Sequence, residues 1–191
     1  MTNHLVIFAK APVLGYVKRR LARDIGQLPA WQFYKRTLRA LVLRLALDRR
    51  WQTHLAITGG RARWPRRMSL IDQGRGDMGK RMARIIRIMP KGPVVIIGSD
   101  IPDIQRSHIA CAFKTLGRHD AVFGPAVDGG FWLVGQARRR SIPHLFSHVR
   151  WSTEYALVDT LSNLDPRHRH KILEELIDVD DRQSYDRWRQ R

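Results

Sequence analysis

The stretch VVIIGSDIPD at residues 94–103 decides the fold class. Its four consecutive β-branched residues predict a strand that is buried on both faces, as in the centre of a parallel sheet. This strand places Asp100 and Asp103 at its carboxyl end, where open α/β sheets bind their ligands. We expect Asp100 to hold Mg²⁺ through its carboxylate, with a helix cap as the alternative role. We expect Asp103 to cap the helix that begins near Arg106.

The sequence around this strand alternates between short apolar runs and amphipathic stretches, which is typical of α/β proteins. The expected strands are residues 4–9, 54–58, 69–72, 94–98, 121–124, 131–134 and 174–179. The expected helices are residues 29–49, 78–89, 106–116, 153–164 and 181–189, with Ser152 and Asp180 as candidate N-caps of the last two. These elements predict a three-layer α/β/α sandwich with a mostly parallel central sheet. No internal repeat or long linker separates them, so we expect one domain over residues 1–191.

The composition limits the class of protein. The 191 residues include 35 Lys and Arg against 17 Asp and Glu, for a formal net charge of +18, and 43% of them are hydrophobic, enough for a folded core. Cys111 is the single cysteine and cannot form an intramolecular disulfide, and no Cys/His spacing predicts a zinc site. The first residues lack a signal-peptide pattern, and no apolar run approaches the length of a membrane span. We therefore expect a cytoplasmic protein without a membrane span.

The excess positive charge is spread along the sequence rather than gathered in one stripe. Residues 59–67 hold several arginines around Trp64 and Pro65, and we interpret them as a solvated connection rather than a phosphate-binding loop. No RNA-recognition motif or paired Cys/His finger accompanies the charge. Binding of nucleic acid or another polyanion is therefore an alternative function, and we do not expect nucleic acid as the main partner.

A basic loop follows the first expected strand, in AKAPVLGYVKRRL at residues 9–21. Its four cations are Lys10, Lys18, Arg19 and Arg20. Arginine forks and lysine point charges both bind phosphate oxygens. The loop has one glycine, Gly15, and so is neither a Walker A motif nor a Rossmann fingerprint. From these residues alone, a diphosphate cradle and an ordinary basic loop both stay open.

A second acidic loop follows the next central strand, in GPAVDGGFWL at residues 124–133. Asp128 precedes Gly129 and Gly130, and paired glycines allow close approach of a ligand to the backbone or a positive φ. A simple Asp-Gly hairpin turn is the alternative interpretation. Two Asp-bearing loops opposite a basic loop nevertheless form a pattern suited to a metal ion and phosphates.

Five motifs, in this order, resemble a known family. They are AKAPxxGxxKxRL, QGxGDMGxRM, IGSDIPDI, GPAxDGGFWLxG and WST, and they span about residues 4–180. The combination resembles an uncharacterised bacterial glycosyltransferase-like family connected with arsenosugar biosynthesis. Its fold is that of GT-A glycosyltransferases and nucleotidyltransferases, which include 2-phospho-L-lactate guanylyltransferase and molybdenum cofactor guanylyltransferase.

The resemblance implies a site for a nucleotide diphosphate and a metal ion. The residues that match its nucleotide- and phosphate-binding motifs are Lys10, Gly15, Lys18, Arg20, Gln73, Gly74 and Asp77. The second of these motifs continues from Asp77 to Met82, and the resemblance implies that it lies near the nucleobase or ribose. Asp100 matches the aspartate that stands in for a metal-binding DXD motif, with Mg²⁺ or Mn²⁺ as the cofactor. Asp128, Gly129 and Gly130 match the acceptor-side loop. Trp151 belongs to the WST motif and lines the acceptor pocket in this interpretation, with simple packing as the alternative.

The sequence departs from the family pattern at two places. Arg19 stands where the family usually has threonine, so a phosphate contact through that hydroxyl is in doubt while extra positive charge could compensate. The closing residues 177–181, IDVDD, resemble the DVDTPED ending that is common in this fold class, without its Thr-Pro pair.

These features favour a metal-dependent transferase that uses a nucleotide-activated donor, and the family name favours glycosyl transfer to a small acceptor. Asp128 would orient or deprotonate the acceptor hydroxyl as the catalytic residue. The expected partners are a nucleotide sugar or nucleoside triphosphate and a small-molecule acceptor. One alternative is a guanylyltransferase-like nucleotidyltransferase, and another is a polyanion-binding protein. A third is an inactive relative of the enzymes, for which Arg19 is the one hint.

Overall fold

The computed structural model describes residues 1–60, 62, 64 and 68–190. Within them, seven strands form one sheet in the order β3-β2-β1-β4-β6-β5-β7. The strands are β1 His4–Lys10, β2 Gln52–Thr58, β3 Ser69–Asp72, β4 Val94–Ile97, β5 Ala121–Pro125, β6 Phe131–Gln136 and β7 His170–Ile172. Strand β6 runs antiparallel to β4 and β5, and the other neighbouring pairs are parallel. The expected mostly parallel sheet is confirmed.

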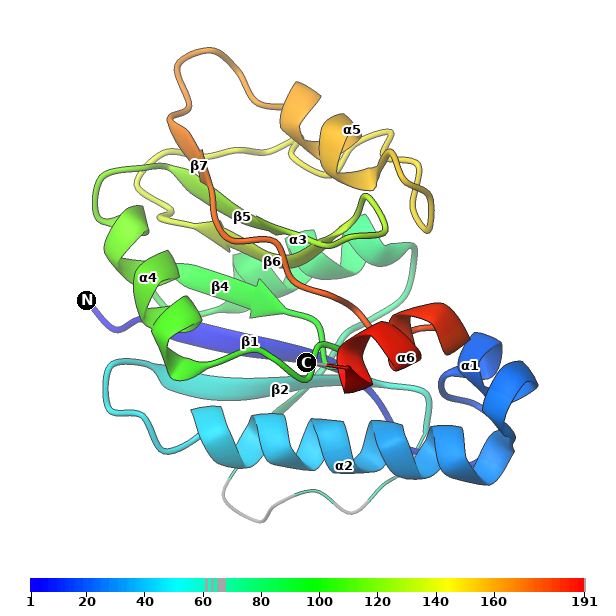
Figure 1. The fold of residues 1–191 in the computed structure, drawn as a ribbon. Coiled ribbons are helices and arrows are strands. Elements are labelled where there is room, and N and C mark those ends of the chain that lie inside the picture. The colour runs from blue at the N-terminus through cyan, green and yellow to red at the C-terminus, as the bar shows by residue number, and fades with distance from the viewer. Residues whose placement is uncertain (61, 63, 65–67, 191) are drawn as a thin grey trace.

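Helices cover both faces of the sheet (Figure 1). They are α1 Arg19–Ile25, α2 Gln27–Leu45, α3 Met78–Ile88, α4 Arg106–Leu116, α5 Ala156–Ser162 and α6 Arg182–Arg189. Helices α2 and α4 pack on one face, and α3 and α5 pack on the other. The predicted three-layer α/β/α architecture is therefore confirmed. In the described part of the chain, no helix combines the length and the apolar character that crossing a membrane requires.

The alternation of side chains along the central strands builds the two halves of the core. In β1, Leu5 and Ile7 face the α2 and α4 layer, whereas Val6 and Phe8 face the α3 layer. All four residues of β4 are buried, as the β-branched run predicts. Full burial of each such side chain contributes roughly 1.5–3 kcal/mol. Two adjacent buried strands therefore hold the loops that follow them in fixed positions.

The C-terminal segment packs against α1 and α2 beside the sheet. Helix α6 lies next to α1 in Figure 1, and a third apolar cluster joins Leu21 of α1 to Phe33 of α2 and to Val179 and Trp188 near the C-terminus. The backbone N–H of Leu21 donates to the carbonyl of Asp180 at 2.9 Å. The C-terminal segment is thus fixed against the loop that follows β1.

One expected strand is misplaced. Residues 174–179 were expected to form the last strand, but the strand is β7, and the later segment makes one isolated bridge, Ala126 to Leu176. The pairing of β5 with β7 stops at Phe123 and Ile172, next to an irregularity in β5 at Gly124 and Pro125. Beyond this point the later segment keeps separate backbone hydrogen bonds to the end of β5, such as that from the N–H of Leu176 to the carbonyl of Pro125, in place of a regular ladder, and Leu176 is buried.

The predicted caps were also wrong, each for a local reason. Gln105 is the N-cap of α4, while Asp103 accepts a hydrogen bond from the indole of Trp188 at 3.2 Å. Asp181 caps α6 through the backbone N–H of Ser184. Tyr155 occupies the N-cap position of α5, which begins after a turn. The candidates Ser152 and Asp180 are therefore not the N-caps of α5 and α6. Part of the expected loop 59–67 lies outside the described residues.

Candidate active-site cavity

A cavity of about 480 Å³ opens at the carboxyl ends of β1, β2 and β4. The chain continues from β1 toward β2 and β3 on one side of the sheet, while β4, β6, β5 and β7 lie on the other side. The boundary between β1 and β4 is therefore a topological switch point, where open α/β sheets bind ligands. Lys10 ends β1 and Asp100 follows β4, and both line the cavity.

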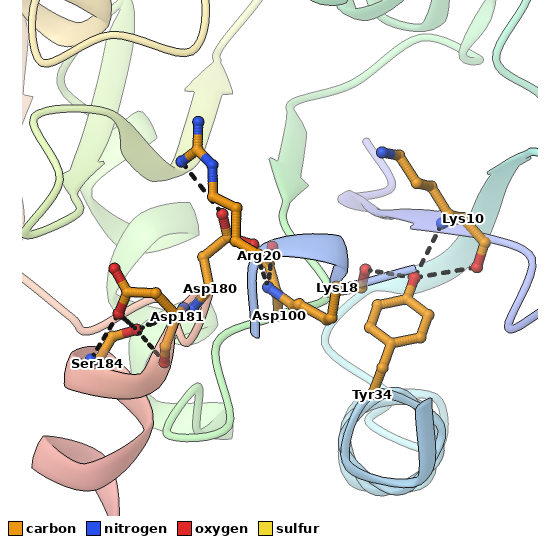
Figure 2. Close-up of polar contacts among 9 residues, drawn as sticks. Lys10, Lys18, Arg20, Tyr34, Asp100, Asp180, Asp181 and Ser184 are labelled. Carbon is orange, nitrogen blue, oxygen red and sulfur yellow. Dashed lines mark hydrogen bonds and ion pairs between the residues drawn. The ribbon is translucent and has the colours of Figure 1, made fainter. Parts of the chain in front are cut away.

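Lys18 is the most buried charged side chain of the site. Its side chain is 4% exposed, and its Nζ lies 2.9 Å from Oδ2 of Asp100 and 3.3 Å from Oδ1 of Asp180 (Figure 2). Burial lowers the pKa of Lys18, but the two carboxylates outweigh it, and the net pKa is raised. Lys18 is therefore charged and engaged by two acidic partners. Its predicted contact with phosphate stays a prediction.

The acidic side of the cavity is only partly neutralised. Burial raises the pKa of Asp100, yet Lys18 outweighs this effect and the net pKa is lowered, so Asp100 is ionised. Burial, followed by the charges of Asp128 and Asp100, raises the pKa of Asp178 to about 6. The negative charges of Asp100 and Asp128 thus both act on Asp178, and the buried ammonium of Lys18 partly offsets them. Such a site favours the arrival of further positive charge.

Two cations near these carboxylates are open to solvent. Arg20 has a side chain that is 68% exposed, and its Nη1 reaches Asp180 at 3.4 Å. Lys10 is exposed, and among the described residues its side chain forms no ion pair. Its backbone is fixed instead, because Tyr34 accepts a hydrogen bond from its N–H at 2.9 Å and donates to its carbonyl at 3.0 Å (Figure 2). Lys10 and Arg20 are thus available to an anionic ligand.

The loop that carries Asp128 is a tight turn between β5 and β6. Oδ1 of Asp128 accepts a hydrogen bond from the backbone N–H of Gly130 at 2.9 Å. Gly129 has φ +84, and a Cβ there would overlap the backbone of Glu154. At Gly129, the group that approaches the backbone closely is therefore Glu154 of the same chain, where a ligand was expected. Asp128 and Gly130 line the cavity, whereas Gly129 holds the loop in place.

The QGxGDMGxRM motif builds one wall of the cavity. Gln73 is buried, and Asp77 is the N-cap of α3, accepting from the backbone N–H of Lys80 at 2.8 Å. Gly79 packs against Trp151 and Phe146, because a Cβ at this position would be 2.7 Å from the indole. Much of this motif therefore has a structural reason for its residue types.

Trp151 lines the cavity and is half-buried, as predicted for the WST motif. Its ring packs edge-on against Phe131, with ring centroids 6.2 Å apart, and contacts Phe146 at the same separation. The indole is therefore both a packing element and a wall of the cavity. Its predicted contact with an acceptor stays a prediction.

The structure brings together most of the predicted site residues. Those that line the cavity are Lys10, Lys18, Arg20, Gln73, Asp100, Asp128, Gly130 and Trp151. Gly15, Gly74, Asp77 and Gly129 are not among the described residues that line it. The resemblance included Arg81 in a matched stretch, residues 77–82, without giving it a role of its own, and it lines the cavity. Sequence reasoning missed Tyr34, Asp178 and Asp180 as lining residues. The IDVDD ending was the available signal for the two aspartates.

The C-terminal segment explains why those aspartates reach the cavity. The backbone N–H of Val179 donates to the carbonyl of Asp100 at 3.2 Å, and the N–H of Leu176 donates to that of Pro125 at 3.1 Å. The segment therefore crosses the loops after β4 and β5. It places Asp178 and Asp180 beside groups that are more than fifty residues away in the sequence.

Comparison with known proteins now identifies the family. A family model described as "Uncharacterized protein conserved in bacteria (DUF2064)" matches residues 36–153. The chain belongs to this family. The resemblance inferred from the five motifs, to an uncharacterised bacterial family, is thereby confirmed. A search of curated protein sequences finds no match.

DUF2064 shares its fold with solved transferase structures. A protein from Desulfovibrio desulfuricans G20, provisionally described as a nucleotide-diphospho-sugar transferase, is 26% identical, with a TM-score of 0.84 over 95% of this chain and 84% of its own. CMP:2-keto-3-deoxy-manno-octonic acid synthetase in complex with CTP is 9% identical, with a TM-score of 0.59 over 100% and 98%. Glucosyl-3-phosphoglycerate synthase from Mycobacterium tuberculosis, with Mg²⁺ and UDP, is 10% identical, with a TM-score of 0.59 over 96% and 73%. The predicted nucleotide-diphospho-sugar transferase fold is confirmed.

Proposed function

We propose that this DUF2064 protein is a transferase that uses a nucleotide-activated donor and a divalent metal ion, and that it transfers a glycosyl group to a small acceptor. One observation carries the proposal: the cavity at the switch point has solvent-exposed cations beside a set of interacting carboxylates. Cations suit the phosphates of a donor, and carboxylates suit a metal ion and an acceptor hydroxyl. The fold shared with nucleotide-diphospho-sugar transferases supports this assignment.

The donor's phosphates are assigned to Lys10 and Arg20. Both side chains are exposed at the cavity, so phosphate binding does not require breaking a buried contact. The ammonium of Lys18 lies against Asp100 and Asp180 and offsets part of their negative charge where the phosphates would approach. A charge-assisted hydrogen bond to phosphate is roughly twice as strong as a neutral one.

The metal ion is assigned to Asp100. Mg²⁺ and Mn²⁺ prefer oxygen ligands, and Mg²⁺ is commonly held by one or two carboxylates together with substrate phosphates. As the side chains stand, no group of three His, Cys, Asp or Glu in the described part of the chain could hold a metal ion by itself. Asp100 is ionised, and burial together with the charges of Asp128 and Asp100 raises the pKa of Asp178 to about 6, so these carboxylates fit a cation that arrives with phosphates. When bound, the ion would neutralise the leaving diphosphate.

The acceptor is assigned to the side of the cavity formed by Asp128, Gly130 and Trp151. Asp128 would accept the proton of an acceptor hydroxyl, or orient it, as the bond to the donor breaks. The backbone N–H of Gly130 donates to Oδ1 of Asp128, so this carboxylate starts from a defined position. Trp151 offers an apolar wall beside it.

Nucleotidyl transfer is the second candidate, because the same fold binds CTP in an octonic acid synthetase. The two reactions share the donor site and differ in the bond that breaks. Glycosyl transfer releases a nucleoside diphosphate, whereas nucleotidyl transfer from a triphosphate releases pyrophosphate.

A thermal-shift screen tests the proposed function. Nucleoside diphosphates, nucleoside triphosphates and nucleotide sugars are added with and without Mn²⁺, and a specific ligand should raise the melting temperature by mass action. Arg20→Ala should weaken the shift, and the matched control Arg23→Ala, on the same helix but away from the cavity, should keep it. The released product then distinguishes glycosyl from nucleotidyl transfer. If no nucleotide shifts the wild-type protein, the proposed function is wrong.

A further inference from the structure

Gln73 is a buried amide whose orientation is fixed by the backbone. Its residue is 2% exposed, and its Nε2 donates to the carbonyl of Ala56 at 2.9 Å and to that of Ala9 at 3.2 Å. Both acceptors are carbonyl oxygens, so the nitrogen must face them. The oxygen Oε1 therefore points the other way, toward α3. The ends of β1 and β2 thus dictate where this acceptor lies.

Arg81 of α3 donates a hydrogen bond to that acceptor. Its Nη1 donates to Oε1 of Gln73 at 2.8 Å, and its Nε donates to the carbonyl of Asp77 at 3.3 Å. Within the described part of the chain, the one hydrogen-bond acceptor near its Nη2 is the sulfur of Met78, at 4.0 Å. The guanidinium is held in place on one side and retains free N–H groups on the other. It is half-buried and lines the cavity.

No carboxylate neutralises Arg81 in the described residues. Each of its contacts is neutral, namely an amide oxygen, a carbonyl and a thioether. A partly buried charge without a counter-ion is costly for a fold. By contrast, Lys18 in the same cavity has two acidic partners. The positive charge of Arg81 is therefore available to a negatively charged ligand that enters the cavity.

We propose that Arg81 binds an oxyanion of the substrate, a carboxylate or a phosphate, and that Gln73 is the residue that positions it. The inference rests on the proposed function only in placing the substrate in this cavity. A neutral glutamine suits this role, because it fixes the guanidinium without taking its charge. The free edge of the fork can donate two parallel hydrogen bonds to one oxyanion.

Chemical modification of arginine tests the site directly. Phenylglyoxal reacts with accessible guanidinium groups, and peptide mass spectrometry reports each arginine separately. The probes are inorganic phosphate, malonate and uridine, at equal ionic strength and without metal. Phosphate or malonate should slow the modification of Arg81 but not that of Arg87, an exposed arginine on the same helix. Stronger protection by phosphate would indicate a phosphate ligand, and stronger protection by malonate would indicate a carboxylate ligand. Equal protection of both arginines, or protection by uridine alone, would overturn the proposal.

Variants separate binding from folding. Arg81→Gln should lower phosphate or malonate affinity in calorimetry by about 10- to 100-fold, the value expected for a lost charge-assisted hydrogen bond, while Arg87→Gln should leave it unchanged. Arg81→Lys should recover part of the affinity, because it restores the charge without the fork. In Gln73→Met, phosphate or malonate should no longer protect Arg81 from phenylglyoxal, although the arginine itself is unchanged. Protection equal to that in the wild type would refute the positioning role of Gln73. None of these probes is a nucleotide, so this test can fail while the nucleotide screen succeeds.

Discussion

The ammonium of Lys18 lies 2.9 Å from Oδ2 of Asp100, although 82 residues separate them in the sequence. Lys18 adopts a left-handed backbone conformation, with φ +48, directly before α1, and this turns its side chain inward. The same ammonium reaches Asp180 at 3.3 Å. One buried cation thereby links the loop after β1, the loop after β4 and the C-terminal segment.

Replacing this cation should destabilise the fold. Lys18→Met keeps the length of the side chain and leaves two carboxylates without their buried partner. Because Asp100 and Asp180 are 38% and 39% exposed, we expect a loss of about 1–3 kcal/mol in the free energy of unfolding, below the value for a fully buried pair. Urea denaturation at pH 7.5 measures it. The exposed neighbour gives the control, since Arg20→Met should change stability by less than about 1 kcal/mol. Equal effects of the two variants would contradict the role of Lys18.

Gly129 should be intolerant of a side chain for a steric reason. Gly129→Ala introduces a Cβ into the backbone of Glu154 at a positive φ, so we expect a loss of about 2–4 kcal/mol in the free energy of unfolding. Gly60→Ala shares the positive φ, +111, but meets no atom within 4 Å. It should therefore cost only the conformational strain, about 1–2 kcal/mol. If denaturation curves of the two variants coincide, the close approach of Glu154 is not what selects the glycine.

The buried histidines should make the fold sensitive to acid. His4 and His54 are almost fully buried, with Nδ1 of His4 3.2 Å from Nε2 of His54, and the other nitrogen of each ring has no hydrogen-bond partner among the residues that the structure describes. Burial lowers the pKa of both imidazoles below 6.5. The stability that the neutral rings provide is therefore present above pH 6.5 and is lost as the pH falls below it. Urea denaturation at pH 7.5 and 5.5 should show this loss in the wild type and a smaller one in His54→Leu. The same loss in both proteins would exclude the pair as its source.

Asp178 should show the opposite dependence on pH. Burial and two neighbouring carboxylates raise its pKa from 3.8 to about 6, so the ionised form of Asp178 destabilises the folded state. This cost is present above pH 6 and disappears as the pH falls below 3.8. Asp178→Asn should therefore stabilise the protein at pH 7.5 by about 1–2 kcal/mol, after allowance for solvent screening, and should have no effect near pH 3.5. Thermal denaturation of this variant beside the exposed control Glu175→Gln measures the difference. A destabilised Asp178→Asn at pH 7.5 would contradict it.

The sequence predicts the sheet better than it predicts the site. Local signals were sufficient for β4, because four β-branched residues leave little choice, and for α4, whose expected bounds match those observed. Local signals failed for α1, which begins in the run of cations that we interpreted as a loop. It packs against α2, which follows it directly, and against α6, whose residues lie about 160 positions away. No local pattern contains that information.

The site divides in the same way. Asp100 and Asp128 could be found because each follows a recognisable strand. Asp178 and Asp180 could not be assigned a role, because their position depends on backbone hydrogen bonds from the C-terminal segment to the loops after β4 and β5. Arg81 belongs to a motif that the sequence already contains, but no role of its own could be assigned to it, because its lack of an acidic partner among the described residues is visible only in the folded chain.

The measurement that tests the central claim most directly is a calorimetric titration with the nucleoside diphosphate that the thermal-shift screen selects. It is performed with and without Mn²⁺ on the wild type, Asp100→Asn and Asp128→Asn. Both variants remove one carboxylate charge from the same cavity, so they control for each other. We predict that Asp100→Asn abolishes the Mn²⁺-dependent part of the affinity, while Asp128→Asn keeps it and loses only turnover with an acceptor. Unchanged Mn²⁺-dependent binding in Asp100→Asn, or its loss in Asp128→Asn alone, would contradict the assignment of the metal to Asp100.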